Sequence, residues 1–244
     1  MPPDFVFDPP PTMTVAVTGD SRLFPVRRIF CVGRNYAAHA AEMGNEVDRE
    51  APFYFTKSAQ AICPSGATIP YPPGTAECHY EMELVVALGR GGAGVTRARA
   101  MTLVFGHACG IDLTRRDLQA AAKAARRPWD LGKDFDNAAI VAPIARAGTR
   151  AGEVGDIGDR RIHLDLDGRR VQQARLAEMI WSVPEIIAHL SDYYTLAPGD
   201  LIFTGTPAGV GPVGPGARLC GGIDGLAPVS VSIGPARQDF SSGA

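Results

Sequence analysis

Residues 80–88 alternate polar and apolar side chains in the way that is typical of a β-strand. Because successive side chains of a strand point to opposite faces, Glu81 and Glu83 share one face, while Met82 and Leu84 share the other. Two like charges on a half-buried strand repel each other and are costly to desolvate, so this face favours a bound cation. The alternative is a solvated strand face, which also carries acids two residues apart.

Elsewhere, apolar runs and turn residues predict short elements, most of them strands. Asp167-Gly168 separates two alternating runs and predicts a hairpin. Ser182 and Glu185 form a capping box that predicts a helix through Tyr193. Residues 45–75 otherwise look rich in loops. Because strands predominate and do not alternate regularly with helices, we expect an α+β, mainly β, fold rather than a doubly wound one. Further strands are predicted at residues 14–18, 28–32, 53–56, 104–112, 201–204 and 226–233, and further helices at residues 36–43, 96–103 and 114–125.

Charge and composition narrow the range of partners. The 24 basic side chains nearly balance the 26 acidic ones, which argues against a nucleic acid or an anionic membrane held by bulk charge. No apolar run reaches membrane-spanning length, and the N-terminus lacks the basic start and apolar stretch of a signal peptide. The five cysteines show no spacing of a zinc site or a disulfide framework. We therefore expect a cytoplasmic protein with reduced thiols.

A third carboxylate extends the acidic pair. Asp112 ends an apolar run, residues 104–112, in which it is the only acid. Together with Glu81 and Glu83 it would complete an all-oxygen site. Such a site suits Mg²⁺, Mn²⁺ or Ca²⁺ better than zinc, which favours nitrogen and sulfur ligands.

His39 and Glu42 form a second candidate group. They lie three residues apart on a predicted helix and so share a face. A carboxylate beside an imidazole orients the ring, which is a common way to build a general base for water. The alternative is a surface pair without a catalytic role.

Three further segments carry candidate substrate contacts. Lys133 could stabilise an enolate or carboxylate oxygen beside a metal. Arg116 and Gln119 follow Asp112 on a predicted helix, and an arginine presents a fork of donors to a carboxylate. Thr206 belongs to a Thr-Gly-Thr turn that could donate to an anionic group. Each also has an explanation without a ligand: a loop lysine, a solvated helix face and a tight turn.

Several motifs, taken in order, resemble the fumarylacetoacetate hydrolase family. They read HYEMEL, GIDLTRRD, GKDFD and TGTPAGVGP, and the resemblance runs from about residue 28 to residue 231. Residues 34–42 and 127–130 look most like the members that hydrolyse fumarylpyruvate in bacterial gentisate breakdown.

The resemblance implies a mixed β-sandwich roll with short flanking helices, usually a homodimer, with residues 1–25 as a lead-in and residues 26–244 as the catalytic domain. It also implies a metal held by Glu81, Glu83 and Asp112 and a segment that orders over the site when substrate binds. That segment would carry His39 and Glu42. By the same resemblance, Lys133 would lie beside the substrate oxygens, and the substrate contacts would be Arg34, Arg116, Gln119 and Thr206.

The activity implied is metal-dependent hydrolysis of a carbon–carbon bond in an acylpyruvate, a 2,4-dioxo acid, with fumarylpyruvate giving fumarate and pyruvate. The same metal site could serve an oxaloacetate decarboxylase or another enolate-forming lyase or isomerase. A non-catalytic metal-binding protein is a third interpretation.

Some positions depart from the family pattern or stand outside it. Ser58 replaces a proline that often follows Lys57 in relatives, and Asp134 replaces a small residue. Asp134 would place a negative charge next to Lys133 and alter its pKa. His107, in an apolar strand, is expected to be a hydrogen-bonded core histidine.

Overall fold

The computed structural model describes residues 4–42, 49–148 and 154–236 of the chain. Its largest unit is an eight-stranded mixed sheet, in which β12 (Ala145–Arg146) pairs with β9 beside the main path. The other seven strands, in sheet order, are β4 (Phe53–Lys57), β3 (Arg28–Gly33), β15 (Asp200–Phe203), β8 (Met82–Leu88), β9 (Val104–Asp112), β11 (Ala139–Val141) and β5 (Ile62–Pro64).

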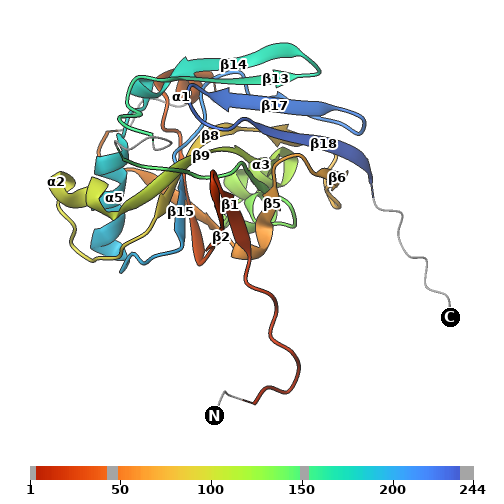
Figure 1. Ribbon diagram of the computed structural model, residues 1–244. Helices are drawn as coiled ribbons and strands as arrows, with labels where there is room; N and C mark the ends of the chain where they lie inside the picture. The colour runs from red at the N-terminus through yellow and green to blue at the C-terminus, as the bar shows by residue number, and fades with distance from the viewer. Residues whose placement is uncertain (1–3, 43–48, 149–153, 237–244) are drawn as a thin grey trace.

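A five-stranded sheet covers one face of the large sheet (Figure 1). Its strands, in order, are β14 (Arg169–Arg175), β13 (Arg161–Leu166), β17 (Arg218–Ile223), β18 (Val229–Ala236) and β6 (Thr68–Tyr71). Apolar side chains of β8 and β9 meet those of β13 and β17, and Met82, Ile111, Leu164 and Leu219 are fully buried between the sheets. Close packing here requires a glycine, because a Cβ added at Gly221 would lie 2.5 Å from the Met82 sulfur.

Two small sheets complete the β-structure. β1 (Thr14–Val17) and β2 (Asp20–Pro25) form a hairpin whose Val15, Val17 and Phe24 side chains join the main core. β7 (Cys78–Tyr80) lies between β10 (Thr114–Arg115) and β16 (Gly211–Pro212). The hairpin falls within residues 1–25; the domain boundary at residue 25 stays a prediction.

The helices are short and flank the sheets (Figure 1). Ser182 and Glu185 make both bonds of the predicted capping box at the start of the longest helix. No helix in the described ranges combines the length and the apolar character needed to cross a membrane. The helices are α1 (Ala37–Glu42), α2 (Arg97–Ala100), α3 (Arg116–Ala124), α4 (Asp130–Lys133) and α5 (Val183–Tyr193), with 3₁₀ turns at Ala59–Ala61, Met101–Leu103 and Leu176–Glu178.

The predicted mainly β fold with short flanking helices is confirmed, and so is the hairpin at Asp167 and Gly168, whose φ values are 51° and 81°. The prediction of a helix from residue 114 was wrong at its start, because Thr114 pairs with His79 as a strand. The interpretation of residues 45–75 as loop-rich missed β5 and β6, and the glycine-containing β17 was not predicted. Met43, the predicted end of α1, lies outside the described residues.

Candidate functional site

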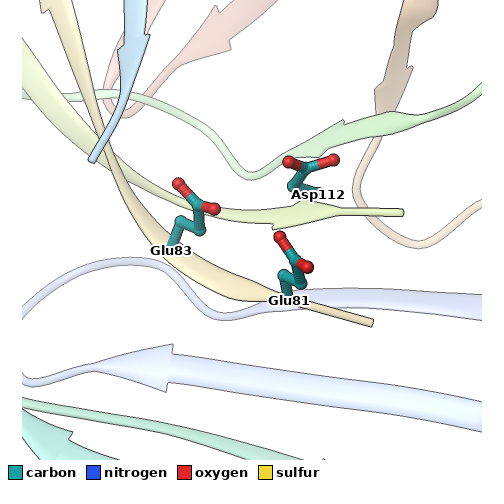
Figure 2. Close-up of side chains that lie close together, drawn as sticks. All are labelled: Glu81, Glu83 and Asp112. Atoms are coloured by element: carbon teal, nitrogen blue, oxygen red, sulfur yellow. The ribbon is translucent and has the colours of Figure 1, made fainter. Parts of the chain in front are cut away.

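Three carboxylates meet where strands β8 and β9 run side by side (Figure 2). Glu83 lies opposite Gly110 in this antiparallel pair, and the Asp112 amide donates to the Glu81 carbonyl at 2.8 Å. This register brings one oxygen from each of Glu81, Glu83 and Asp112 within 4.8 Å of the others. All three side chains are buried, at 6%, 1% and 0% exposure. The acids of the alternating strand therefore do not form a solvated face.

Buried cations already neutralise two of the three acids. Lys133 Nζ lies 2.8 Å from Glu81 Oε2 and 2.9 Å from Asp112 Oδ2. Lys57 Nζ lies 2.8 Å from Asp112 Oδ1, and Arg116 forms a close ion pair with Glu81. Burial opposes the charged form of Lys133, but Asp112 and Glu81 outweigh it and raise the pKa of the ammonium above its usual range. Burial likewise opposes the charged form of Glu81, yet Lys133 and Arg116 hold its pKa below the ordinary value.

Glu83 is the exception within the described part of the chain. Its carboxylate accepts a hydrogen bond from the Gly205 amide at 2.6 Å and forms no ion pair with a lysine or arginine. Burial, Asp112 and Glu81 raise its pKa well above the ordinary value. A hard dication would relieve this repulsion and satisfy three oxygen ligands at once. The residues therefore fit a divalent-metal site.

His39 and Glu42 come together on α1 at the wall of the same cavity. His39 is 6% exposed, and its Nδ1 lies 3.4 Å from Glu42 Oε2. Glu42 also accepts a hydrogen bond from the Gly209 amide, with its oxygens at 3.1 and 3.2 Å. This second anchor connects α1 to the loop after β15 and fixes the carboxylate that orients the imidazole.

The predicted substrate contacts line the same cavity, whose volume is ≈ 730 Å³ including its open mouth. Arg116 Nη1 donates to Gln119 Oε1 at 2.5 Å. The Thr206 hydroxyl accepts from Gln172 Nε2 at 2.9 Å. Eight of the ten predicted site residues lie in the cavity wall, namely Arg34, His39, Glu81, Glu83, Arg116, Gln119, Lys133 and Thr206. The other two, Asp112 and Glu42, contact Lys133 and His39 respectively.

Two residues that hold site residues in place, Lys57 and Gln172, were not predicted from the sequence. Lys57, at the end of β4, is 2% exposed and donates to the Leu113 and Lys133 carbonyls as well as pairing with Asp112. Gln172 accepts from the Met82 amide at 3.0 Å while it holds Thr206. Lys57 ends an aromatic strand, and Gln172 is one of several polar residues in a hairpin strand, so neither stands out in the sequence. The contacts that give them a role cross between elements distant in sequence.

Two further predictions from the sequence concern Asp134 and His107. Asp134 accepts from the Ser58 amide at 2.9 Å and, among the described residues, forms no ion pair with Lys133, whose raised pKa comes chiefly from Asp112 and Glu81. His107 is 2% exposed, but within the described residues no protein group hydrogen-bonds either ring nitrogen. The prediction that His107 is hydrogen-bonded in the core was therefore wrong, although the side chain is buried as expected. Burial lowers its pKa to about 4, so the ring stays neutral in the core.

Comparison with known proteins points to one family. Residues 28–235 match the family described as fumarylacetoacetate (FAA) hydrolase C-terminal. A fumarylpyruvate hydrolase from a Ralstonia species is 46% identical over 196 residues, covering 80% of this chain and 100% of the relative. An oxaloacetate tautomerase from Escherichia coli (strain K12) is 36% identical, covering 83% and 90%. A crystal structure of fumarylpyruvate hydrolase from Pseudomonas aeruginosa, in complex with Mn²⁺ and pyruvate, superposes with a TM-score of 0.90 at 44% identity and covers 95% and 100% of the two chains.

Proposed function

The chain belongs to the fumarylacetoacetate hydrolase family, and from that premise we propose that it is a metal-dependent hydrolase of acylpyruvates that converts fumarylpyruvate into fumarate and pyruvate. The observation that carries the proposal is the joint placement of a buried triple carboxylate and a His39–Glu42 pair in one cavity. The similarity to fumarylpyruvate hydrolases supports the choice of substrate.

The metal would be Mg²⁺ or Mn²⁺, with Ca²⁺ as a further possibility, held by Glu81, Glu83 and Asp112. Bound there, it would supply Lewis-acid chemistry, polarising the substrate carbonyl and stabilising the enolate that leaves. The known presence of Mn²⁺ and pyruvate in the Pseudomonas aeruginosa hydrolase agrees with this assignment.

His39 takes the role of general base. Its imidazole accepts the proton of the attacking water while Glu42, held by the Gly209 amide, fixes the orientation of the ring. The buried ammonium of Lys133 is charged and lies at the cavity wall, where it donates to the developing oxyanion. Attack of water on the acyl carbonyl breaks the bond to the methylene carbon, which leaves as pyruvate enolate and is protonated to pyruvate.

Substrate orientation falls to the polar side chains of the cavity wall. Arg116 and Gln119 are joined to each other and would take the carboxylate and keto oxygens of the pyruvoyl end. Thr206, fixed by Gln172, would donate its hydroxyl to the same end. Arg34 would contact the substrate from another part of the cavity wall. The homodimer expected from the family resemblance stays a prediction.

The test is a pyruvate-release assay on metal-stripped protein, with fumarylpyruvate, acetylpyruvate and oxaloacetate as substrates, with and without added Mg²⁺ or Mn²⁺. Metal-dependent release of equal amounts of pyruvate and the partner acid is expected from the acylpyruvates. The His39→Ala variant should lose about 10²–10⁴-fold in kcat and retain its Mn²⁺ affinity in calorimetry. Full turnover by this variant would remove His39 from the mechanism.

A second candidate is enolate chemistry on oxaloacetate without attack by water. The similarity to oxaloacetate tautomerases favours it. The two candidates differ in their need for a base that activates water. Turnover of oxaloacetate alone, unaffected by His39→Ala, would select the second.

A further inference from the structure

One face of α3 forms a polar track along the cavity. Arg116, Gln119, Ala120 and Lys123 are spaced by three, one and three residues, so they share a face of the helix, and all four line the cavity. Seven residues of α-helix rise by about 10 Å. The track therefore begins at Arg116, which pairs with the buried Glu81, and ends at Lys123 near the exposed end of the helix.

Arg34 lies on another wall of the same cavity, on a turn that its neighbours hold in place. Its φ is 56°, a left-handed conformation that is uncommon for a residue other than glycine. Asn35 anchors the turn by donating to the Trp181 and Thr204 carbonyls at 3.0 and 2.7 Å. The Arg34 guanidinium lies 5.8 Å from the centre of the Phe53 ring, which meets Trp129 edge-on at 5.0 Å. The Phe53 ring thus flanks this cation.

Arg34 and Lys123 differ from the inner cations in having no acid beside them. Arg116 and Lys133 both pair with Glu81. Across residues 4–42, 49–148 and 154–236, no ion pair joins Arg34 or Lys123 to a carboxylate. The cavity wall therefore carries two cations, on separate elements, that no carboxylate of these ranges neutralises.

We propose that Lys123 and Arg34 form an outer subsite that binds a carboxylate at the far end of the acyl group. The inference rests on the proposed function and specifies its substrate class as acylpyruvates with an anionic tail. The two carboxyl carbons of fumarylpyruvate are six bonds apart, about 7 Å when extended. With the pyruvoyl end beside the buried carboxylates, the far carboxylate lies toward Lys123, within reach of its flexible side chain. An acetyl group is too short and carries no charge.

The test compares two substrates that share a pyruvoyl end. Fumarylpyruvate has a carboxylate tail, and acetylpyruvate has a neutral one. For the Mn²⁺-loaded full chain, Lys123→Met should raise KM for fumarylpyruvate, lowering kcat/KM about tenfold as for one partly exposed charge-assisted hydrogen bond. The same variant should change kcat/KM for acetylpyruvate less than about twofold, because acetylpyruvate has no charged tail to contact Lys123. Lys123→Arg should keep the preference for the charged tail.

Arg126→Gln is the matched control. Arg126 is exposed, follows the same helix and is not part of the cavity wall, so its removal subtracts one nearby charge without touching the subsite. If it reduces fumarylpyruvate turnover as strongly as Lys123→Met, long-range charge rather than a contact sets the preference, and the subsite is refuted. An equal effect of Lys123→Met on both substrates would also overturn it.

A binding measurement separates the subsite from the proposed reaction. Mn²⁺-loaded His39→Ala protein is titrated with both acylpyruvates, with and without Lys123→Met. A preference of about tenfold for fumarylpyruvate that disappears with Lys123→Met supports the subsite, even if the wild-type chain hydrolyses neither compound and the proposed function fails. Hydrolysis by the wild type, with a binding preference that survives Lys123→Met, supports the function and refutes the subsite.

Discussion

Lys57 offers a sharp test of how the buried charges stabilise the protein. The proposed change is Lys57→Met, which keeps most of the apolar stem and removes the ammonium. Lys57 and Asp112 both have side chains at 0% exposure, and their charged atoms are 2.8 Å apart. The variant would remove one of the two buried cations beside Asp112 and would leave two backbone carbonyls, those of Leu113 and Lys133, without this donor.

The expected loss follows from these contacts. Removing one partner of a buried ion pair costs about 3–5 kcal/mol. Asp112 keeps its second cation, since Lys133 remains 2.9 Å from Oδ2. We therefore expect the lower end of that range, about 3 kcal/mol, which for a domain of this size corresponds to a fall in Tm of about 6–12 °C. Saturating Mn²⁺ should recover part of the loss, because the dication compensates Asp112 and binds the native state alone.

The assay is urea unfolding of metal-stripped protein, followed by circular dichroism, with and without Mn²⁺. Lys123→Met is the matched control, because it makes the same chemical change at an exposed position and should cost less than about 0.5 kcal/mol. A loss below about 1 kcal/mol for Lys57→Met in the metal-free protein would contradict the claim that this ion pair is a buried structural contact.

Three further predictions concern the walls of the site. Glu83 must lose its proton to bind a metal, and its raised pKa moves this deprotonation to a pH above the ordinary value of about 4.3. The Mn²⁺ affinity measured by calorimetry should therefore rise with pH and then level off. A constant affinity from about pH 5 to 8 would contradict this. Gly205→Ala should lower Tm, because the φ of Gly205 is 95° and an added Cβ would lie 2.7 Å from Asn35 Cβ. Because the Gly205 amide also donates to Glu83, the variant should weaken Mn²⁺ binding at least about tenfold. An unchanged Mn²⁺ affinity would show that the Gly205 backbone does not position Glu83 for the metal. Asp134→Ala should leave kcat within about twofold, because Asp134 binds the Ser58 amide rather than Lys133, and a larger change would restore a role for its charge.

The alternation of residues 80–88 predicts the metal site well because a strand allows only two side-chain directions. Glu81 and Glu83 must share a face, and burial of the surrounding residues makes that face unusual. The capping box at Ser182 and the turn at Asp167 are equally local, and both were predicted from adjacent residues. Such features need no knowledge of the tertiary fold.

Contacts between distant elements were harder to foresee. Lys57 and Asp112 are 55 positions apart, and β3, β15 and β8 separate their strands in the sheet, so only the folded sheet brings the two side chains together. The pairing of Thr114 with His79 overrode the helical pattern from residue 114. Gln172 reaches Thr206 across 34 residues. Sequence spacing alone does not predict such contacts between distant residues. The family resemblance suggested candidate site residues but did not identify Lys57 and Gln172, the buried side chains that hold some of them in place.

The ion pairs that connect Lys57, Asp112, Lys133, Glu81 and Arg116 have a consequence for how the protein is assembled in a cell. Three cations already pair with two of the three acids before any metal arrives, and the raised pKa of Glu83 favours the neutral form of the third. Newly made chains can therefore reach their native fold first and acquire the ion afterwards. A dication can then leave and be replaced while the fold persists, so the occupant of the site follows the supply of ions around the protein rather than the moment of its synthesis.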